Sequence, residues 1–133
     1  MKQDMVLSNS AENPKIRVLI VEDNARFRQA FKDNLQIVSP ALDIQEAVEG
    51  QECLEKVEAF HPQLVFMDIR LPGESGLSLT KKIKARYPEM MIVVLTSYDN
   101  QEYRDAAFQS GANRFVSKDS LNFEEMAALI HSI

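Results

Sequence analysis

The segment Ile16-Arg17-Val18-Leu19-Ile20-Val21 runs directly into Glu22-Asp23-Asn24, and this junction decides the fold. Its aliphatic and β-branched side chains are typical of a strand buried in a parallel sheet. Two carboxylates then stand where the strand ends, and Asn24 is a preferred helix-capping residue. The segment therefore predicts a buried strand that leads through acidic side chains into a helix, whose apolar residues recur at helical spacing: Phe27, Ala30, Phe31 and Leu35.

The same alternation of a short apolar run and a segment of helical period repeats along the chain. It predicts five strands, at residues 16–21, 42–48, 63–67, 91–95 and 114–117. A helix is expected after each strand: one capped by Asn24, one from Gly50 to His61, one from Ser75 or Gly76 to Pro88, one through Tyr103–Ser110 closed by Gly111, and a last one with Phe123, Met126, Ala127 and Ile130 on its core stripe. Strict alternation favours an α/β fold, a doubly wound parallel sheet with helices on both faces.

Chemically capable residues stand just past the carboxyl ends of four expected strands: Glu22, Asp23, Asp68, Thr96 and Lys118. Ligands of open α/β sheets bind outside these ends, where the strand order reverses. Three carboxylates in one cleft repel each other unless a cation intervenes, and oxygen ligands without histidine or thiolate suit Mg²⁺, or alternatively Mn²⁺. Asp68 is then the natural nucleophile toward a phosphoryl donor, while Thr96 and Lys118 can bind phosphoryl oxygens.

Each of these residues also has a structural interpretation. Glu22-Asp23-Asn24 alone is most often a helix cap with a favourable charge for the helix dipole. Alone, Asp68 is a turn residue, Thr96 a β-branched strand end and Lys118 a solvated charge. Because all of them are expected at one edge of the sheet, the functional interpretation is favoured over the separate structural ones.

Composition sets further bounds. The 133 residues fit one domain and carry a net charge of −5, which argues against nucleic-acid binding by this domain. The longest apolar run, Met90–Leu95, is too short to cross a membrane. The single cysteine, Cys53, excludes an internal disulfide framework and favours a cytoplasmic location. Residues 1–14 are expected to form a flexible leader, and residues 15–133 the folded domain.

Four stretches, in this order and spacing, resemble the receiver domains of two-component response regulators: 18–24 (VLIVEDN), 67–76 (MDIRLPGESG), 95–97 (LTS) and 111–118 (GANRFVSK). The resemblance covers Lys15 to the end. It implies a flavodoxin-like sheet of order 2-1-3-4-5 with five helices. It also implies that Asp68 accepts a phosphoryl group from a sensor histidine kinase or phosphotransfer protein, so that the chain is a phosphoacceptor signalling domain and not an enzyme.

The resemblance assigns roles to individual residues. Mg²⁺ would be bound by Asp23, Asp68 and the main-chain carbonyl of Arg70, with Glu22 contributing through water.

A coupled switch pair is implied as well, in which the Thr96 hydroxyl moves toward the phosphate and the Phe115 ring turns inward. The side chains of Arg70 and Tyr98 would flank the path of the water that hydrolyses the acyl phosphate. Both are large and neither suits the orientation of a water, which predicts slow dephosphorylation.

The stretch 96–120 looks most like receivers attached to helix-turn-helix transcription factors. The chain is thus expected to control transcription through a domain that it does not contain; a stand-alone regulator that acts by protein–protein contact is the alternative. The expected partner face comprises the helix through 103–110, the strand 114–117 and the last helix. Phe108 lies off its helix's core stripe and is expected to face outward near Phe115 and Ser117, where a homodimer formed on phosphorylation would make contact.

Three rival functions are disfavoured by particular residues. An aspartate-nucleophile phosphohydrolase would carry a second Asp, as general acid, where this chain has Arg70. A flavodoxin would bind a phosphate after the first strand, where Glu22 and Asp23 would repel it. A receiver-like scaffold that is never phosphorylated would be expected to lack Asp68, Thr96 or Lys118.

Overall fold

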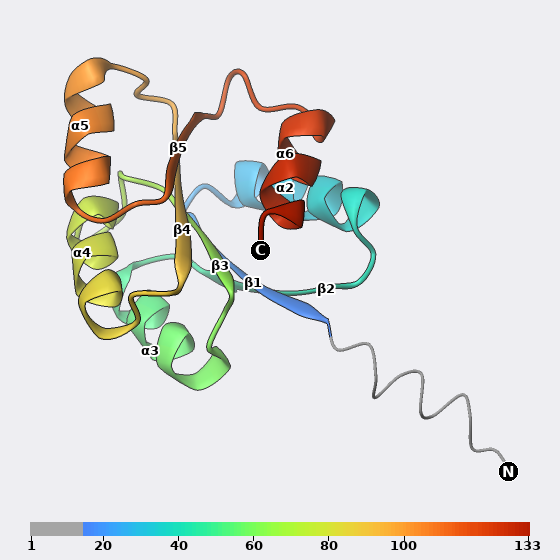
Figure 1. The fold of residues 1–133 in the computed structure, drawn as a ribbon, viewed down its shortest axis with the longest axis horizontal. Coiled ribbons are helices and arrows are strands. Elements are labelled where there is room, and N and C mark those ends of the chain that lie inside the picture. The colour runs from blue at the N-terminus through green and yellow to red at the C-terminus, as the bar shows by residue number, and fades with distance from the viewer. Residues whose placement is uncertain (1–14) are drawn as a thin grey trace, which may run out of the picture.

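The structure, a computed structural model, describes residues 15–133 (Figure 1). The predicted flexible leader, residues 1–14, lies outside the described residues. Strands and helices alternate in the order β1 (Ile16–Val21), α2 (Ala25–Val38), β2 (Leu42–Ala47), α3 (Gly50–Phe60), β3 (Leu64–Met67), α4 (Gly76–Arg86), β4 (Met91–Thr96), α5 (Gln101–Gln109), β5 (Arg114–Ser117) and α6 (Phe123–His131). None of the helices within 15–133 is both long and apolar enough to span a membrane.

All strand pairs are parallel, and the strand order β2-β1-β3-β4-β5 is the one that the resemblance to receiver domains implied. The order reverses at β1, which pairs with β2 on one side and with β3 on the other. In the register of β1 and β3, Val21 lies opposite Met67, so Glu22 and Asp68, which follow them, lie side by side at the carboxyl edge of the sheet. The topology therefore places the acidic residues at the switch point where such folds bind ligands.

Two helical layers enclose the sheet. Helices α2 and α6 cover one face, and α3, α4 and α5 cover the other (Figure 1). Alternate residues of β1 point to opposite layers: Val18 and Ile20 pack with α2 and α6, whereas Leu19 and Val21 pack with α3 and α4. Because both faces are covered, the central strands are apolar throughout, and these apolar runs are what predicted the strands from the sequence.

Polar side chains fix where the helices begin. The capping residue of each helix accepts a hydrogen bond from a main-chain N–H in the first turn: Asn24, Glu49, Ser75, Asn100 and Asn122. At the start of α4, Gly76 packs against the acceptor segment. A Cβ atom at this position would lie 1.9 Å from the Asp68 carbonyl oxygen, so no larger residue fits without displacement.

Two details of the helix prediction are wrong. Phe123 was expected on the core stripe of the last helix, but it is 52% exposed; the residues that α6 buries are Met126, Leu129 and Ile130. Ala30 of α2 is exposed as well. Helical spacing gives the direction of a side chain around the helix, but it does not say whether another element covers that point of the helix. Strand ends differ from expectation by one residue at β2, β3 and β4.

Candidate functional site

Three carboxylates meet at the carboxyl edge of the sheet. One oxygen from each of Glu22, Asp23 and Asp68 lies within 4.8 Å of the others. The Glu22 and Asp68 side chains are buried, whereas Asp23 is exposed. The cluster offers only hard oxygen donors, which fits Mg²⁺ or Mn²⁺.

Lys118 supplies the positive charge of the cluster. Its Nζ lies 2.6 Å from Glu22 Oε1 and 3.5 Å from Asp68 Oδ2, and its side chain is 13% exposed. The ammonium group also lies 4.4 Å from the centroid of the Phe27 ring, a cation–π distance that completes its surroundings. The lysine is therefore held between α2 and the acidic cluster, closer to Glu22 than to the predicted acceptor.

The surroundings of Asp68 disfavour its charged form. Burial and the neighbouring Glu22 charge raise its pKa to about 6, although Lys118 and the main-chain N–H of Arg70 act in the opposite direction. One lysine thus leaves the three carboxylates undercompensated. Such a cluster would gain from a bound divalent cation, because the cation favours the ionised form of each ligand.

The predicted switch residues both lie inside the protein. Thr96 is fully buried, and its Oγ1 accepts a hydrogen bond from the main-chain N–H of Tyr98 at 3.1 Å. The Phe115 ring is 7% exposed and packs in one cluster with Ile69, the neighbour of the acceptor. Arg104 of α5 places its guanidinium 4.7 Å from the centroid of this ring. In this structure the ring therefore faces inward, under α5.

Arg70 and Tyr98, the predicted dephosphorylation gate, contact each other. The Arg70 guanidinium carbon lies 4.2 Å from the Tyr98 ring centroid, and Nη2 lies 3.5 Å from the Tyr103 hydroxyl. The two tyrosine rings are 5.9 Å apart. The bond to Tyr103 raises the pKa of Arg70 further, so the guanidinium stays charged. Three segments thus meet through these side chains: the loops after β3 and β4, and the first turn of α5.

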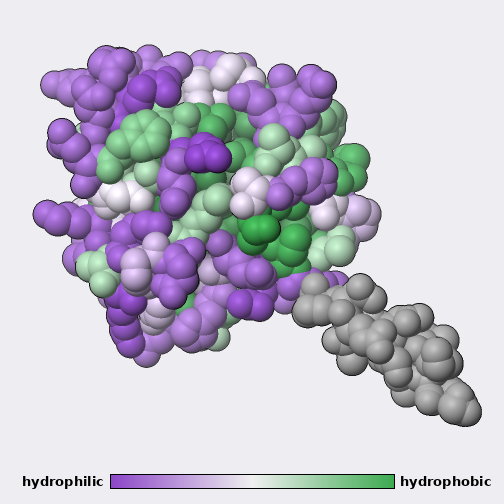
Figure 2. Space-filling model, in the orientation of Figure 1, coloured by the Kyte–Doolittle hydropathy of each residue, from purple (hydrophilic) through white to green (hydrophobic). Residues whose placement is uncertain are grey.

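The predicted partner face carries an exposed aromatic and a groove. Phe108 is 47% exposed, which confirms that it points away from the core. A cavity of about 320 Å³ lies between β5 and α6, where Phe115, Val116 and Leu129 line it. In Figure 2, green residues lie among purple ones on this side of the molecule, in the area that β5 and α6 occupy in Figure 1.

Sequence reasoning missed the side chains that support the site: Phe27, Arg28, Tyr103 and Arg104. Phe27 and Arg28 follow each other at the start of α2, about one turn after the acidic pair, and this proximity in the chain is the only signal in the sequence. Tyr103 packs against the core cluster under α5, as its helical spacing predicted, but the contact of its hydroxyl with Arg70 was not foreseen. Their contacts depend on segments far apart in the chain, and periodicity carries no information about those.

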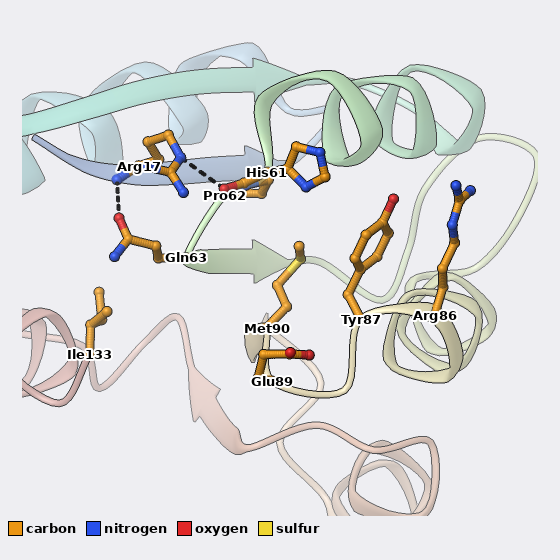
Figure 3. A pocket seen from close by; sticks show the side chains of 9 residues that line it. All are labelled: Arg17, His61, Pro62, Gln63, Arg86, Tyr87, Glu89, Met90 and Ile133. Atoms are coloured by element: carbon orange, nitrogen blue, oxygen red, sulfur yellow. Dashed lines mark hydrogen bonds between the residues drawn. The ribbon is translucent and has the colours of Figure 1, made fainter.

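A second cavity, of about 480 Å³, lies at the opposite edge of the sheet (Figure 3). Arg17, His61, Arg86 and Tyr87 are among its lining residues. Helices α3 and α4 end beside it, and their carboxyl ends favour nearby positive charge. The cations there are thus explained by the fold, and none of the predicted site residues lines this cavity.

The fold and the carboxyl edge define a class of protein: a flavodoxin-like doubly wound domain with an acidic cluster and a lysine at its switch point. The sequence profile of the family described as "Response regulator receiver domain" matches residues 18–131. The chain therefore belongs to this family, and it is the receiver domain of a two-component response regulator.

Two curated regulatory proteins are similar to this chain in sequence and support this assignment. Oxygen regulatory protein NreC of Staphylococcus haemolyticus is 33% identical over 106 residues, which cover 79% of this chain and 49% of that protein. Transcriptional regulatory protein DegU of Brevibacillus brevis is 26% identical over 113 residues, which cover 85% of this chain and 48% of that protein. The chain thus spans about half the length of these curated relatives.

Solved structures show the same fold. A CheY-like response regulator receiver domain protein from Methanospirillum hungatei JF-1 has a TM-score of 0.80 and 25% identity, with 89% of this chain and 92% of that chain covered. A DNA-binding response regulator of the LuxR family from Staphylococcus aureus has a TM-score of 0.80 and 22% identity, with 88% and 97% covered. At this level of identity the second likeness concerns the fold alone.

Proposed function

We propose that the chain accepts a phosphoryl group on Asp68 from a sensor histidine kinase or a phosphotransfer protein, in the presence of Mg²⁺ or Mn²⁺. The observation that carries this proposal is the surroundings of Asp68. It is a buried carboxylate at the end of a central strand, within reach of two further carboxylates and one lysine. A residue that only formed a turn would not need surroundings that disfavour its charged form.

The chemistry follows from these groups. A carboxylate oxygen of Asp68 attacks phosphorus, the P–N bond of a donor phosphohistidine breaks, and its electron pair returns to the imidazole. Lys118 neutralises a phosphoryl oxygen, and the Thr96 hydroxyl donates a hydrogen bond to another. A bound Mg²⁺, held by Asp23, Asp68, the main-chain carbonyl of Arg70 and, through water, Glu22, would offset the charge of the remaining oxygens.

Phosphorylation would act on the output through the switch pair. The Thr96 hydroxyl would leave the Tyr98 N–H for the phosphoryl oxygen, and the loop between β4 and α5 would follow it. Phe115 packs beneath α5 and shares its cluster with Ile69, so a movement of this loop would reach the ring. We propose that α5, β5 and α6 form the partner face, with Phe108, Phe115 and Ser117.

The output that we propose is transcription, through a domain beyond this chain. NreC and DegU are named as regulatory proteins, and the chain matches about half of each. The alternative is a stand-alone regulator that binds a partner protein. The groove between β5 and α6 would serve either output, since both need a surface that changes on phosphorylation.

The lifetime of the acyl phosphate would be set by Arg70 and Tyr98. Their mutual stacking holds two large side chains together beside the acceptor. Neither side chain is a carboxylate or an amide, the groups suited to orienting an attacking water. We therefore propose slow self-dephosphorylation.

One experiment tests the central proposal. The protein is incubated with Mg²⁺ and acetyl phosphate, and intact-mass and peptide analysis then locate the modification. Modification of Asp68 that disappears with EDTA or in Asp68→Asn supports the proposal. Modification at another residue, or none at all under conditions where the protein is folded, contradicts it.

A further inference from the structure

Each hydrogen-bonding group of Glu22 has a protein partner. Its main-chain N–H donates to Ala47 O at 2.9 Å, and its main-chain carbonyl accepts from Arg28 Nη1 at 2.8 Å. Its carboxylate accepts from the Asn24 N–H at 3.0 Å through one oxygen and pairs with Lys118 through the other. The backbone at the end of β1 is thus fixed on both sides, and Arg28 is the only side chain that bonds its main chain within residues 15–133.

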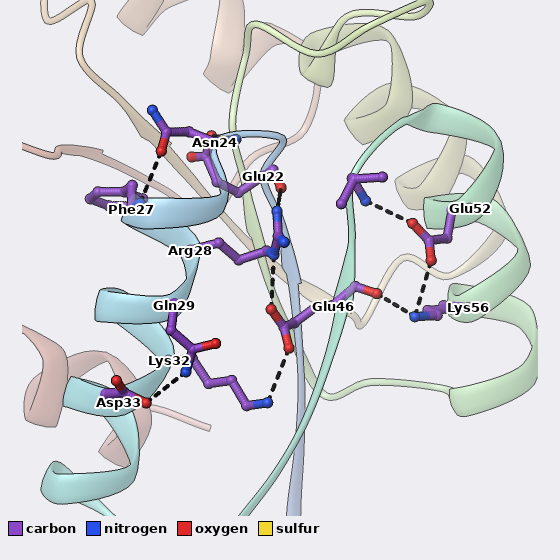
Figure 4. A network of polar contacts seen from close by, with 11 residues as sticks. Glu22, Asn24, Phe27, Arg28, Gln29, Lys32, Asp33, Glu46, Glu52 and Lys56 are labelled. Carbon is purple, nitrogen blue, oxygen red and sulfur yellow. Dashed lines mark hydrogen bonds and ion pairs between the residues drawn. The ribbon is translucent and has the colours of Figure 1, made fainter.

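The Arg28 side chain that bonds Glu22 is also held by a second partner. Its Nε donates to Glu46 Oε1 at 2.8 Å, and the other oxygen of Glu46 accepts from Lys32 Nζ at 3.0 Å (Figure 4). Lys56 of α3 donates to the Glu46 main-chain carbonyl. The Arg28 and Glu46 side chains are only 17% and 27% exposed, so water screens these charge-assisted bonds incompletely. The network orients the guanidinium so that Nη1 reaches the Glu22 carbonyl at the end of β1.

We propose that Arg28 is a positioning residue for the metal site, an inference that rests on the Mg²⁺ binding proposed above. The peptide that joins Glu22 to Asp23 is planar, so a bond to the Glu22 carbonyl also fixes the N–H of Asp23. Asp23 is exposed, and its carboxylate makes no hydrogen bond or ion pair with another residue of 15–133. Its direction therefore depends on the backbone that Arg28 holds.

The charge of Arg28 and its bond to the Glu22 carbonyl are expected to have opposite effects on the affinity for Mg²⁺. Arg28 carries a positive charge close to a cation site, so its charge alone weakens Mg²⁺ binding. Its bond to the Glu22 carbonyl strengthens binding, because it holds Asp23 in place. Lys32 offers a matched comparison: it has the same charge, lies on the same helix and shares the Glu46 partner, but it does not contact Glu22.

The experiment compares Arg28→Met with Lys32→Met by calorimetric Mg²⁺ titration of the whole chain, after circular dichroism has confirmed folding. The wild type is expected to bind, Lys32→Met to bind as tightly or more tightly, and Arg28→Met at least fivefold more weakly. Arg28→Lys keeps the charge but cannot serve Glu22 and Glu46 in the same way, so it is expected to stay weak; it also replaces Arg28→Met if that variant does not fold.

A double-mutant cycle with Asp23→Ala shows whether Arg28 acts through Asp23. If it does, Arg28→Met causes no further loss of affinity in the Asp23→Ala background. Additive losses, or equal affinities of Arg28→Met and Lys32→Met, overturn the inference and leave the metal site standing. A wild type that does not bind Mg²⁺ overturns the proposed metal site, and this inference with it.

Discussion

The Lys118 ammonium group is closer to Glu22 than to Asp68, at 2.6 Å against 3.5 Å. The lysine is therefore engaged in the acidic cluster before any phosphoryl group arrives. Burial and the neighbouring Glu22 charge raise the pKa of Asp68 to about 6, and Lys118 offsets only part of this effect. The three residues form one charge cluster, and a change in one of them is expected to alter the titration of another.

The first prediction concerns this coupling in metal-free protein. Lys118→Met is expected to raise the pKa of Asp68 above about 6, because the lysine stabilises the carboxylate. Glu22→Gln is expected to lower it, because a like charge and its hydrogen bond disappear. Titration of the Asp68 carboxyl carbon by NMR measures both shifts. Shifts in the same direction in the two variants would contradict this electrostatic account.

The second prediction is that Asp68→Asn stabilises the metal-free protein at high pH. The pKa of Asp68 is higher in the folded chain than in the unfolded chain, so the folded state binds more protons between about pH 4 and 6. Wild-type stability is thus lost as pH rises through this window. At pH 8 the variant should be more stable by about 3 kcal/mol, because the pKa rises from 3.8 to about 6 and each pKa unit corresponds to about 1.4 kcal/mol.

Urea unfolding of both proteins at several pH values, in EDTA, tests this prediction. The advantage of Asp68→Asn should shrink as pH falls and vanish near pH 4. Asp119→Asn is the control, since Asp119 is an exposed carboxylate outside the cluster. A pH-independent difference between wild type and Asp68→Asn would mean that burial of the charge is not its cause.

The sequence predicted the fold because the sheet is covered on both faces. Each central strand must then be apolar and end abruptly at its polar neighbours, so apolar runs located the ends of the strands to within one residue. The same argument located Glu22, Asp23, Asp68 and Lys118 at one edge, where the structure brings them together.

The contacts around the site could not be predicted in this way. That Lys118 pairs with Glu22, and that Phe27 lies against it, depends on the side-chain conformations of three separate elements. Phe123 was predicted to be buried because its helical spacing suits the core, but no other element within residues 15–133 covers its side chain, which is 52% exposed. Periodicity determines directions within one element; distances between elements require the packed structure.

The third prediction concerns Gly76. Its Cβ position lies 1.9 Å from the Asp68 carbonyl oxygen and 2.8 Å from the carbonyl carbon, and both are backbone atoms that cannot rotate away as the end of a side chain can. Gly76→Ala is expected to destabilise the chain by about 3 kcal/mol, the upper range of overpacking effects. Gly73→Ala is the control: it has a φ of +81° but nothing within 4 Å, so only backbone strain of about 1 kcal/mol is expected. Equal losses in urea unfolding would contradict a steric cause.

The fourth prediction concerns the partner face. If phosphorylation drives dimerisation, Phe108→Ala should weaken the dimer and leave phosphoryl uptake unchanged, because Phe108 is exposed and distinct from the acceptor. Analytical ultracentrifugation of the phosphorylated proteins measures the dissociation constants. Ile37→Ala is the matched control, since Ile37 is 69% exposed on α2, outside the face. Equal dimerisation of wild type and Phe108→Ala would remove Phe108 from the interface.

The fifth prediction is that the acyl phosphate persists for minutes to hours, because Arg70 and Tyr98 shield it together. Hydrolysis needs a water in line behind the phosphorus, and the stacked guanidinium and ring would occupy that approach. Arg70 can also pair with a phosphoryl oxygen and hold the group in place. The measurement is phosphate release after Asp68 has been loaded and the donor removed. The wild type should lose phosphate slowly, and the Arg70→Asn, Tyr98→Glu double variant several-fold faster.

Because the two side chains contact each other, their effects are expected to be non-additive. Tyr98→Glu alone frees Arg70 from the ring, so it should reproduce much of the double variant's acceleration. Tyr103→Phe removes only the hydroxyl that lies 3.5 Å from Arg70 and keeps both rings, so its rate should stay close to that of the wild type. If both side chains instead swing into solvent, all four proteins would release phosphate at the same rate. That result would show that neither residue controls the water, even though the two are stacked on each other.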